Sequence, residues 1–165
     1  MLKLNQINRF NSILKRFKST LVIVEHDNQK LNPVSLNALT AATKLPKNES
    51  ITCLVAGNGD CSKIAEEVAG INGVTKVLVT NNPALNGFLP EAFAPLVVSA
   101  QKQFTFSHIL VGSSAFGKNL LPRVGALLDA QPVSDIIGIN DENTFVRTIY
   151  AGNAIQTVRS KDNVG

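Results

Sequence analysis

A glycine-rich segment in the last third of the chain carries the sharpest chemical pattern of the sequence. It reads GSSAFGKN over residues 112–119 and lies between an apolar run and an expected helix. In a phosphate-binding loop, backbone N–H groups hold the phosphates of a nucleotide and the lysine reaches the outer ones. Gly112, Gly117 and Lys118 are therefore candidate residues of an anion- or nucleotide-binding loop, as in a small P-loop-like nucleotide-binding enzyme.

The same segment departs from the phosphate-loop pattern at its last position. The pattern requires Ser or Thr there, because the hydroxyl binds Mg²⁺, and this sequence has Asn119. The alternative is a packing role, in which Gly112 ends a strand, Gly117 lets a helix approach closely and Lys118 is a solvated surface residue. The pattern alone leaves both interpretations open.

Other polar residues form no recognisable catalytic set. Asp141 follows an apolar run and resembles a magnesium-binding carboxylate, but single acids after strands are frequent. Arg123 could bind an anion or only cap neighbouring carbonyls, and we favour the structural role. His26 and His108 have no matching acid or cysteine spacing around them. Since no nucleophile elbow, dinucleotide fingerprint or metal-ligand spacing is present, we expect neither a catalytic site nor a metal site.

From residue 21 onward, short β-branched runs alternate with longer helical patterns. We expect strands at 21–24, 51–56, 74–79 and 107–111, and helices at 33–45, 61–69, 90–103 and 119–129. Asn32-Pro33 opens the first helix and Asp60 can cap the second. A further strand at 133–139 and a hairpin of 145–150 with 154–158 complete the pattern. We therefore predict the α/β class: a doubly wound, mostly parallel sheet with helices on both faces and a C-terminal β-hairpin.

The positive charge is concentrated at the amino terminus. The formal net charge is +4, but five of the sixteen Lys and Arg lie in residues 1–20, which contain no acid. Eleven basic and twelve acidic residues remain in the rest of the chain, which is therefore nearly neutral. Binding to nucleic acid needs clustered Lys and Arg, so nucleic acid is not an expected partner.

Residues 1–19 have the pattern of a mitochondrial targeting presequence. Ile7, Phe10, Leu14 and Phe17 fall on one helical face, and basic residues lie mostly off that stripe. We expect import into the mitochondrial matrix, removal of the presequence somewhere around Phe17 to Ser19, and an α/β domain over residues 20–165. No stretch approaches the roughly 20 apolar residues that span a bilayer.

Seven segments, taken in order along the chain, carry a resemblance to a known family. They are LVIVEH (21–26), CLVAG (53–57), TKVLV (75–79), QKQF (101–104), SAFGKNLLPRV (114–124), SDII (134–137) and FVRTIYAGNA (145–154). Together they resemble the alpha subunit of the electron-transfer flavoproteins, over essentially everything from Ser19 to about Val158.

The resemblance implies an electron carrier subunit rather than an enzyme. Proteins of this family move electrons from acyl-CoA dehydrogenases to a ubiquinone oxidoreductase in fatty-acid β-oxidation, as a heterodimer with a beta subunit that holds an AMP. Their FAD lies in a C-terminal domain of the alpha subunit, which we expect this chain to lack. The resemblance therefore implies a docking scaffold for the beta subunit that does not retain FAD alone, and no cofactor-binding residue is carried over.

Overall fold

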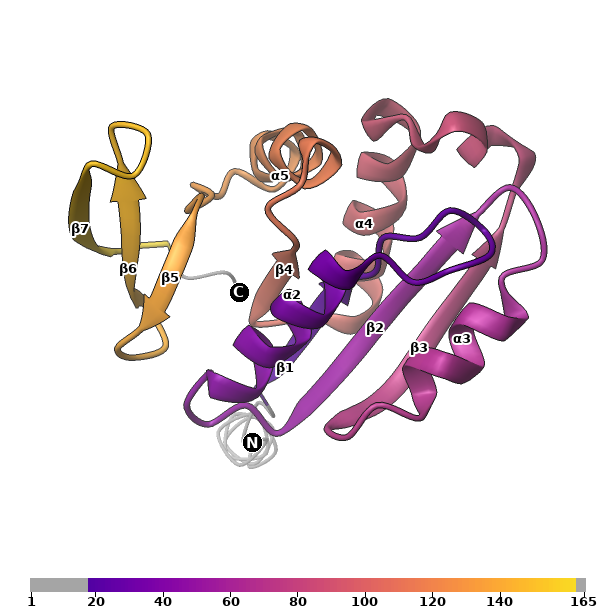
Figure 1. Ribbon diagram of the computed structural model, residues 1–165, viewed down its shortest axis with the longest axis horizontal. Helices are drawn as coiled ribbons and strands as arrows, with labels where there is room; N and C mark the ends of the chain where they lie inside the picture. Colours follow the sequence, from indigo (N-terminus) through magenta and orange to yellow (C-terminus); the bar gives the residue numbers. More distant parts are fainter. Residues whose placement is uncertain (1–17, 163–165) are drawn as a thin grey trace, which may run out of the picture.

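The computed structural model describes residues 18–162, and a four-stranded parallel sheet lies at its centre (Figure 1). Its strands are β1 (Ser19–Ile23), β2 (Ser50–Gly57), β3 (Val74–Asn81) and β4 (His108–Val111). They lie in the order β3-β2-β1-β4, so β1 is hydrogen-bonded on both sides. Val22 of β1 is in register with Cys53 on one side and Leu110 on the other. The predicted parallel sheet is confirmed.

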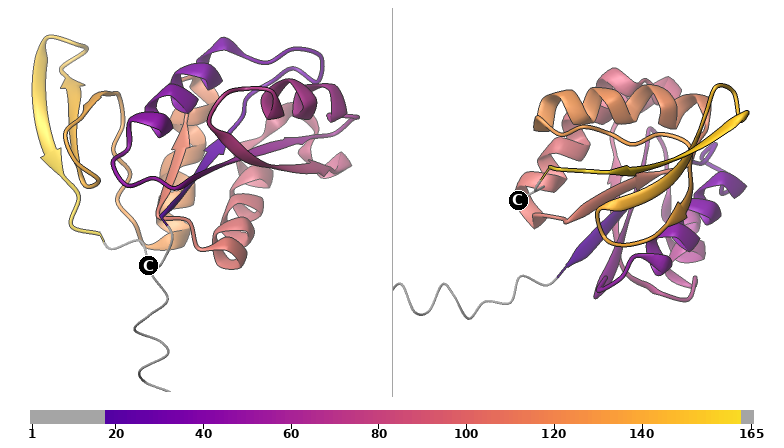
Figure 2. Two further views of the ribbon diagram at one scale, coloured as in Figure 1. Left: turned by 90° about the horizontal axis from the view of Figure 1, so that it is seen from below. Right: turned by 90° about the vertical axis from the view of Figure 1, so that its left-hand side faces the viewer.

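Helices cover both faces of this sheet (Figure 2). The helices α2 (Pro33–Lys44) and α3 (Ser62–Ala69) pack on one face, and α4 (Pro90–Phe104) and α5 (Ala115–Leu128) pack on the other. A short 3₁₀ helix, η1 (Pro83–Phe88), precedes α4 and was not predicted. Within residues 18–162, no helix combines the length and the apolar character that crossing a membrane requires.

Strand β1 is buried on both faces because the two helical layers enclose it. Leu21 and Ile23 belong to the core shared with α4 and α5, whereas Val22 and Val24 belong to the core shared with α2 and α3. All four side chains are at most 2% exposed. A continuous apolar run, rather than an alternating one, is what a parallel strand covered on both faces requires.

The helix starts show where local sequence decides the structure. The Asn32 side chain accepts a hydrogen bond from the backbone N–H of Val34 and Pro33 is the first residue of α2, as predicted. Asp60 accepts from the N–H of Ser62, but the residue that precedes α3 is Cys61.

The predicted start of the last helix at Asn119 is wrong. Helix α5 begins four residues earlier, at Ala115, because the hydroxyl of Ser114 caps it by accepting from the N–H of Gly117.

A second, smaller sheet follows α5 and lies beside β4, at the end of the molecule away from α3 (Figure 1). It is antiparallel, with β5 (Ile136–Ile139), β6 (Thr144–Ile149) and β7 (Ala154–Arg159) in that order. The predicted hairpin is confirmed as β6 and β7. The strand expected at 133–139 begins only at Ile136, because Asp135 has a left-handed backbone (φ 54°) that changes the direction of the chain. This strand, β5, pairs with β6 of the hairpin.

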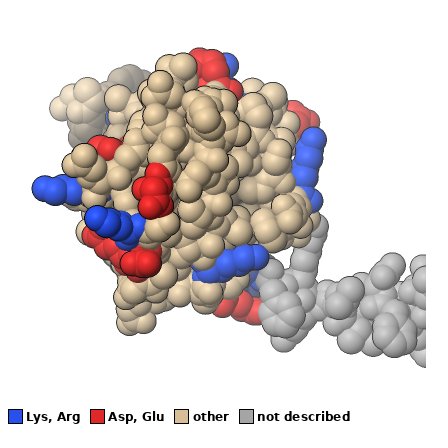
Figure 3. All heavy atoms as spheres, turned by 90° about the vertical axis from the view of Figure 1, so that its right-hand side faces the viewer, with Lys and Arg blue, Asp and Glu red and all other residues tan. Residues whose placement is uncertain are grey.

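Charged side chains are dispersed over the surface. On the face that Figure 3 shows, Lys and Arg lie singly or beside Asp and Glu, with uncharged surface between them. The described residues form four ion pairs, in which Lys18 and Lys47 share Glu142 while Lys118 and Arg123 each have an acid of their own. This distribution agrees with the nearly neutral composition of the domain.

Candidate functional site

The candidate site lies at the carboxyl ends of β1 and β4. The chain runs from β1 outward to β2 and β3 and then returns to β4 on the other side of β1, so the strand order reverses between β1 and β4. In open α/β sheets, ligands bind at such a reversal, outside the carboxyl ends of the strands. The segments that meet here are Glu25-His26 after β1 and Gly112-Ser113-Ser114 after β4.

A buried carboxylate lies beside the start of α5. The Ser114 hydroxyl donates to Glu25 Oε1 (2.7 Å) while its oxygen accepts from the N–H of Gly117 (2.9 Å). The N–H of Glu25 donates to Ser35 Oγ (2.8 Å), which fixes the segment to α2. Glu25 is only 8% exposed, and this burial raises the pKa of its carboxyl group, although the hydrogen bond from Ser114 opposes the shift. The carboxyl group of Glu25 thus already lies at the amino-terminal, partly positive end of α5.

The glycines of the loop are required by close packing. A β-carbon on Gly117 would lie 2.0 Å from the carbonyl oxygen of Gly112, and one on Gly112 would lie 2.8 Å from the Val34 side chain. Gly117 and Lys118 also lie inside the first turn of α5, not in the loop before it. This geometry favours the packing alternative. Anion binding by Gly112, Gly117 and Lys118 stays a prediction.

Lys118 contacts an acid that the sequence did not single out. Its Nζ lies 3.2 Å from Asp135 Oδ1, and Ser113 Oγ donates to the same oxygen (2.8 Å). The hydrogen bonds from Ser113 and Lys118 hold the pKa of Asp135 below its ordinary value. The side chain of Lys118 is 56% exposed, which agrees with a solvated residue, but it also ties α5 to the segment before β5.

His26 is held between two backbone groups. Its Nε2 lies 3.1 Å from the carbonyl oxygen of Ala56, to which it donates, and its Nδ1 accepts from the N–H of Asn28 (3.1 Å). Burial lowers the pKa of the imidazole, and the hydrogen bond to Ala56 partly opposes this. The neutral ring therefore joins the ends of β1 and β2 and has a structural role.

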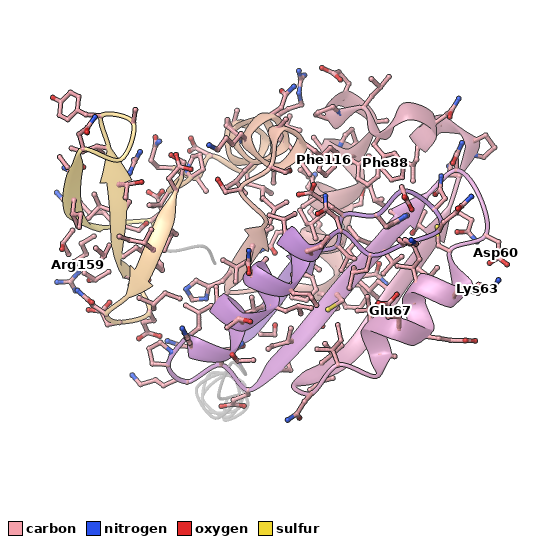
Figure 4. The ribbon with its side chains drawn as sticks, in the orientation of Figure 1. Asp60, Lys63, Glu67, Phe88, Phe116 and Arg159 are labelled. Atoms are coloured by element: carbon pink, nitrogen blue, oxygen red, sulfur yellow. The ribbon has the colours of Figure 1, made fainter. Side chains whose placement is uncertain are left out.

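Aromatic rings close the site on the side of η1 and α4. The His26 ring meets Phe88 edge-on with a centroid distance of 5.3 Å, Phe88 stacks on Phe93 at 5.8 Å, and Phe93 meets Phe116 edge-on at 5.1 Å. Figure 4 labels Phe88 and Phe116, the two outer phenylalanines of this row. These contacts between aromatic edges and faces fix the loops around the strand ends.

The remaining candidates have structural partners. Arg123 donates to Glu91 (2.6 Å) and so joins α5 to α4, which agrees with the favoured structural role. Asp141 accepts from the N–H of Asn143 (2.8 Å) in the turn before β6, and this lowers its pKa. Within residues 18–162, no three His, Cys, Asp or Glu side chains lie where they could share a metal ion.

Known proteins are similar to this chain over nearly its whole length. The pattern of the family described as "Electron transfer flavoprotein domain" matches residues 20–164. The chain is 48% identical over 145 residues to "Probable electron transfer flavoprotein subunit alpha, mitochondrial" of Caenorhabditis elegans, covering 88% of this chain and 43% of that protein.

Two further relatives show the same partial coverage. The chain is 43% identical over 162 residues to "Electron transfer flavoprotein subunit alpha, mitochondrial" of Dictyostelium discoideum (94% of this chain, 44% of that protein). It is 45% identical over 140 residues to "Electron transfer flavoprotein subunit alpha" of Pseudomonas aeruginosa (85% and 44%). The chain thus spans less than half the length of these curated relatives.

Replacing Gly117, in the first turn of α5, tests the packing role. Ala normally stabilises a helix relative to Gly by about 1 kcal/mol, but Gly117→Ala would place its β-carbon against the Gly112 carbonyl. We expect a loss of about 2–3 kcal/mol in the free energy of unfolding, measured by urea denaturation. The control Gly59→Ala, with no atom within 4 Å of its β-carbon, should change it by less than about 1 kcal/mol. Equal effects would contradict the packing role.

The buried Glu25 predicts a pH dependence of stability. Because folding raises its pKa, the folded state keeps this proton to higher pH than the unfolded state, so stability falls as pH rises through the folded-state pKa. Glu25→Gln removes this dependence. We expect the wild type to lose stability relative to Glu25→Gln as the pH rises above about 4.3, the ordinary pKa of glutamate, measured by urea denaturation. A difference that stays constant with pH would rule out the shift.

Proposed function

The chain belongs to the electron transfer flavoprotein family, and we propose that it acts as the amino-terminal domain of an alpha subunit. In this role it is part of the carrier that moves electrons from acyl-CoA dehydrogenases to the respiratory chain in fatty-acid β-oxidation. The proposal is carried by the match of the family pattern to residues 20–164, together with 43–48% identity to three proteins named subunit alpha. The relatives do not support the alternative of a P-loop-like nucleotide-binding enzyme that uses Gly112, Gly117 and Lys118.

The polar groups at the carboxyl ends of the strands support a scaffold rather than a reactive centre. The carboxylate of Glu25 is bound by Ser114, and the amine of Lys118 is bound by Asp135. Polar groups that bind one another in this way hold the loops in fixed positions. We propose that the domain contributes a rigid surface to which the beta subunit docks, and that electron transfer itself belongs to the complete carrier.

The small sheet is the best candidate for that docking surface. It exposes the side chains of Ile137, Tyr150 and Ile155, of which Tyr150 is 78% and Ile155 69% exposed. Among the described residues, β7 pairs with β6 alone, which leaves its outer edge, ending at Arg159 (Figure 4), open to another strand. Exposed apolar groups beside an open strand edge are typical of protein interfaces. Because the relatives are named as subunits, we assign this surface to the beta subunit.

The FAD of the family does not fit the glycine-rich turn of this domain. A flavin dinucleotide needs backbone N–H groups that are free to meet its pyrophosphate. Here the Val34 side chain packs on Gly112, and the Ser114 hydroxyl is already shared by Glu25 and Gly117. We therefore propose that this chain does not retain FAD by itself, and that the cofactor binds to another part of the complete carrier.

The mitochondrial matrix is the proposed location. Two of the relatives are named mitochondrial, and residues 1–19 have the basic, acid-free composition of a targeting presequence. Residues 1–17 of this presequence lie outside the described residues. We propose that the presequence directs the domain of residues 20–165 to the matrix.

Co-expression with a beta subunit tests the docking role. We expect a stable complex by size-exclusion chromatography, and we expect Ile155→Asp to weaken it at least tenfold because a charge would enter an apolar contact. Leu36→Asp, on the exposed side of α2, is the matched control and should leave the complex unchanged. Absence of any complex with the wild type would refute the docking role, and equal effects of the two variants would refute its location.

The cofactor proposal has its own test. The purified chain should be colourless, because the glycine-rich turn is occupied by the chain's own side chains. Its visible absorbance spectrum after purification with excess FAD measures this directly. A flavin spectrum at one equivalent per chain would show that the domain binds the cofactor alone.

A further inference from the structure

The small sheet is attached to the rest of the domain mainly by polar contacts. Within residues 18–162, neither of the two apolar cores contains a side chain of β5, β6 or β7. Phe145 of β6 is buried, but it lies outside both cores. Apolar packing, which usually fixes one layer of a domain against another, is therefore limited here. The orientation of the small sheet depends on the polar contacts at its boundary with the main sheet.

Asp135 ties the beginning of β5 to the carboxyl end of β4. It immediately precedes β5, and its Oδ1 accepts a hydrogen bond from Ser113 Oγ (2.8 Å) and lies 3.2 Å from Lys118 Nζ. Ser113 lies in the loop after β4, and Lys118 lies in the first turn of α5. Aspartate also tolerates the left-handed backbone of this position better than most residues do.

Glu142 ties the other end of β5 to the amino ends of β1 and β4. It lies in the turn between β5 and β6 and forms an ion pair with Lys18, the residue before β1. Lys47 Nζ lies 3.6 Å from the other oxygen of the same carboxylate. His108, the first residue of β4, donates from Nε2 to the backbone carbonyl of Glu142 (2.7 Å). Two lysines and a histidine thus hold this turn against the main sheet.

The two acids attach β5 at both of its ends. Because Asp135 meets the carboxyl end of β4 and Glu142 meets its amino end, β5 runs beside β4 in the opposite direction (Figure 1). The two strands nevertheless belong to different sheets. A sheet that is attached at one point can rotate about that point, whereas attachment at both ends of one strand opposes the rotation.

We propose that Asp135 and Glu142 are positioning residues that hold the small sheet in the orientation that the beta subunit binds, an inference that rests on the proposed docking role. Neither acid belongs to the exposed apolar surface of Ile137, Tyr150 and Ile155. Both act through the orientation of that surface. A surface that is already held in its bound orientation loses less freedom when a partner binds, so the partner binds more tightly.

The distance between two spin labels tests the positioning in the full chain without a partner. Lys63→Cys on α3 and Thr157→Cys on β7 provide exposed labelling positions, and both native cysteines are buried. Pulsed electron paramagnetic resonance should give a narrow distribution of label distances in the labelled chain with both acids present. The same chain with Asp135→Asn and Glu142→Gln should give a broader one. An equally narrow distribution would overturn the positioning role.

Glu91→Gln is the matched control for this measurement. It removes the ion pair between Glu91 and Arg123, which joins α4 to α5 and does not involve the small sheet. The distribution of label distances should stay narrow in this variant. Equal broadening in the control would overturn the proposal, because it would show that the loss of any exposed ion pair loosens the domain. A general loss of stability would lower the urea midpoint of unfolding without broadening the distribution among folded chains.

The dissociation constant for a purified beta subunit tests the consequence for docking. We expect Asp135→Asn and Glu142→Gln each to raise it about 1.5- to 5-fold, as for the loss of a partly exposed ion pair. The double variant should raise it about 2- to 25-fold, the product for independent sites. A double variant that binds as tightly as Glu91→Gln would overturn the positioning role and leave docking intact. Failure of the wild type to bind would overturn docking, and the positioning role with it.

Discussion

The burial of β1 between two strands and two helical layers is the constraint on which the rest of the structure depends. Leu21 and Ile23 are covered by α4 and α5, while Val22 and Val24 are covered by α2 and α3. Because β1 takes β2 on one side and β4 on the other, the strand order must reverse beside it. The reversal brings together the loops that follow β1 and β4, at the carboxyl ends of these strands. At the amino end of β1, Lys18 lies beside the small sheet, where it forms an ion pair with Glu142.

The two ends of β1 serve different purposes in the proposed function. At the carboxyl end, where related folds bind ligands, the hydroxyl of Ser114 binds Glu25 beside the start of α5, so the chain itself holds the two loops together. At the amino end, Glu142 connects the small sheet to the main sheet through Lys18 and His108. A domain fixed at both ends presents its small sheet in one orientation, which suits a docking role within a larger carrier.

Local patterns predicted most of the elements, and contacts between distant segments account for what they missed. The apolar runs and the Asn32 cap are local, so the four strands of the main sheet and the first helix were predicted. The early start of α5 could have been found from Ser114, a good capping residue just before the helix. The hydrogen bond between Ser114 and Glu25 joins residues 89 positions apart in the sequence. The ion pair between Lys118 and Asp135 forms only after the chain folds back. The spacing of residues along the chain does not reveal such contacts. From local spacing alone, the glycine-rich segment therefore resembled a phosphate loop.

In the proposed carrier, this domain docks through its small sheet. Hydrogen–deuterium exchange of the chain, with and without a beta subunit, measures this directly. We expect slower exchange in β6 and β7, over residues 144–159, when the beta subunit is present, and little change in α3. Protection of α3 with unchanged exchange over residues 144–159 would contradict it.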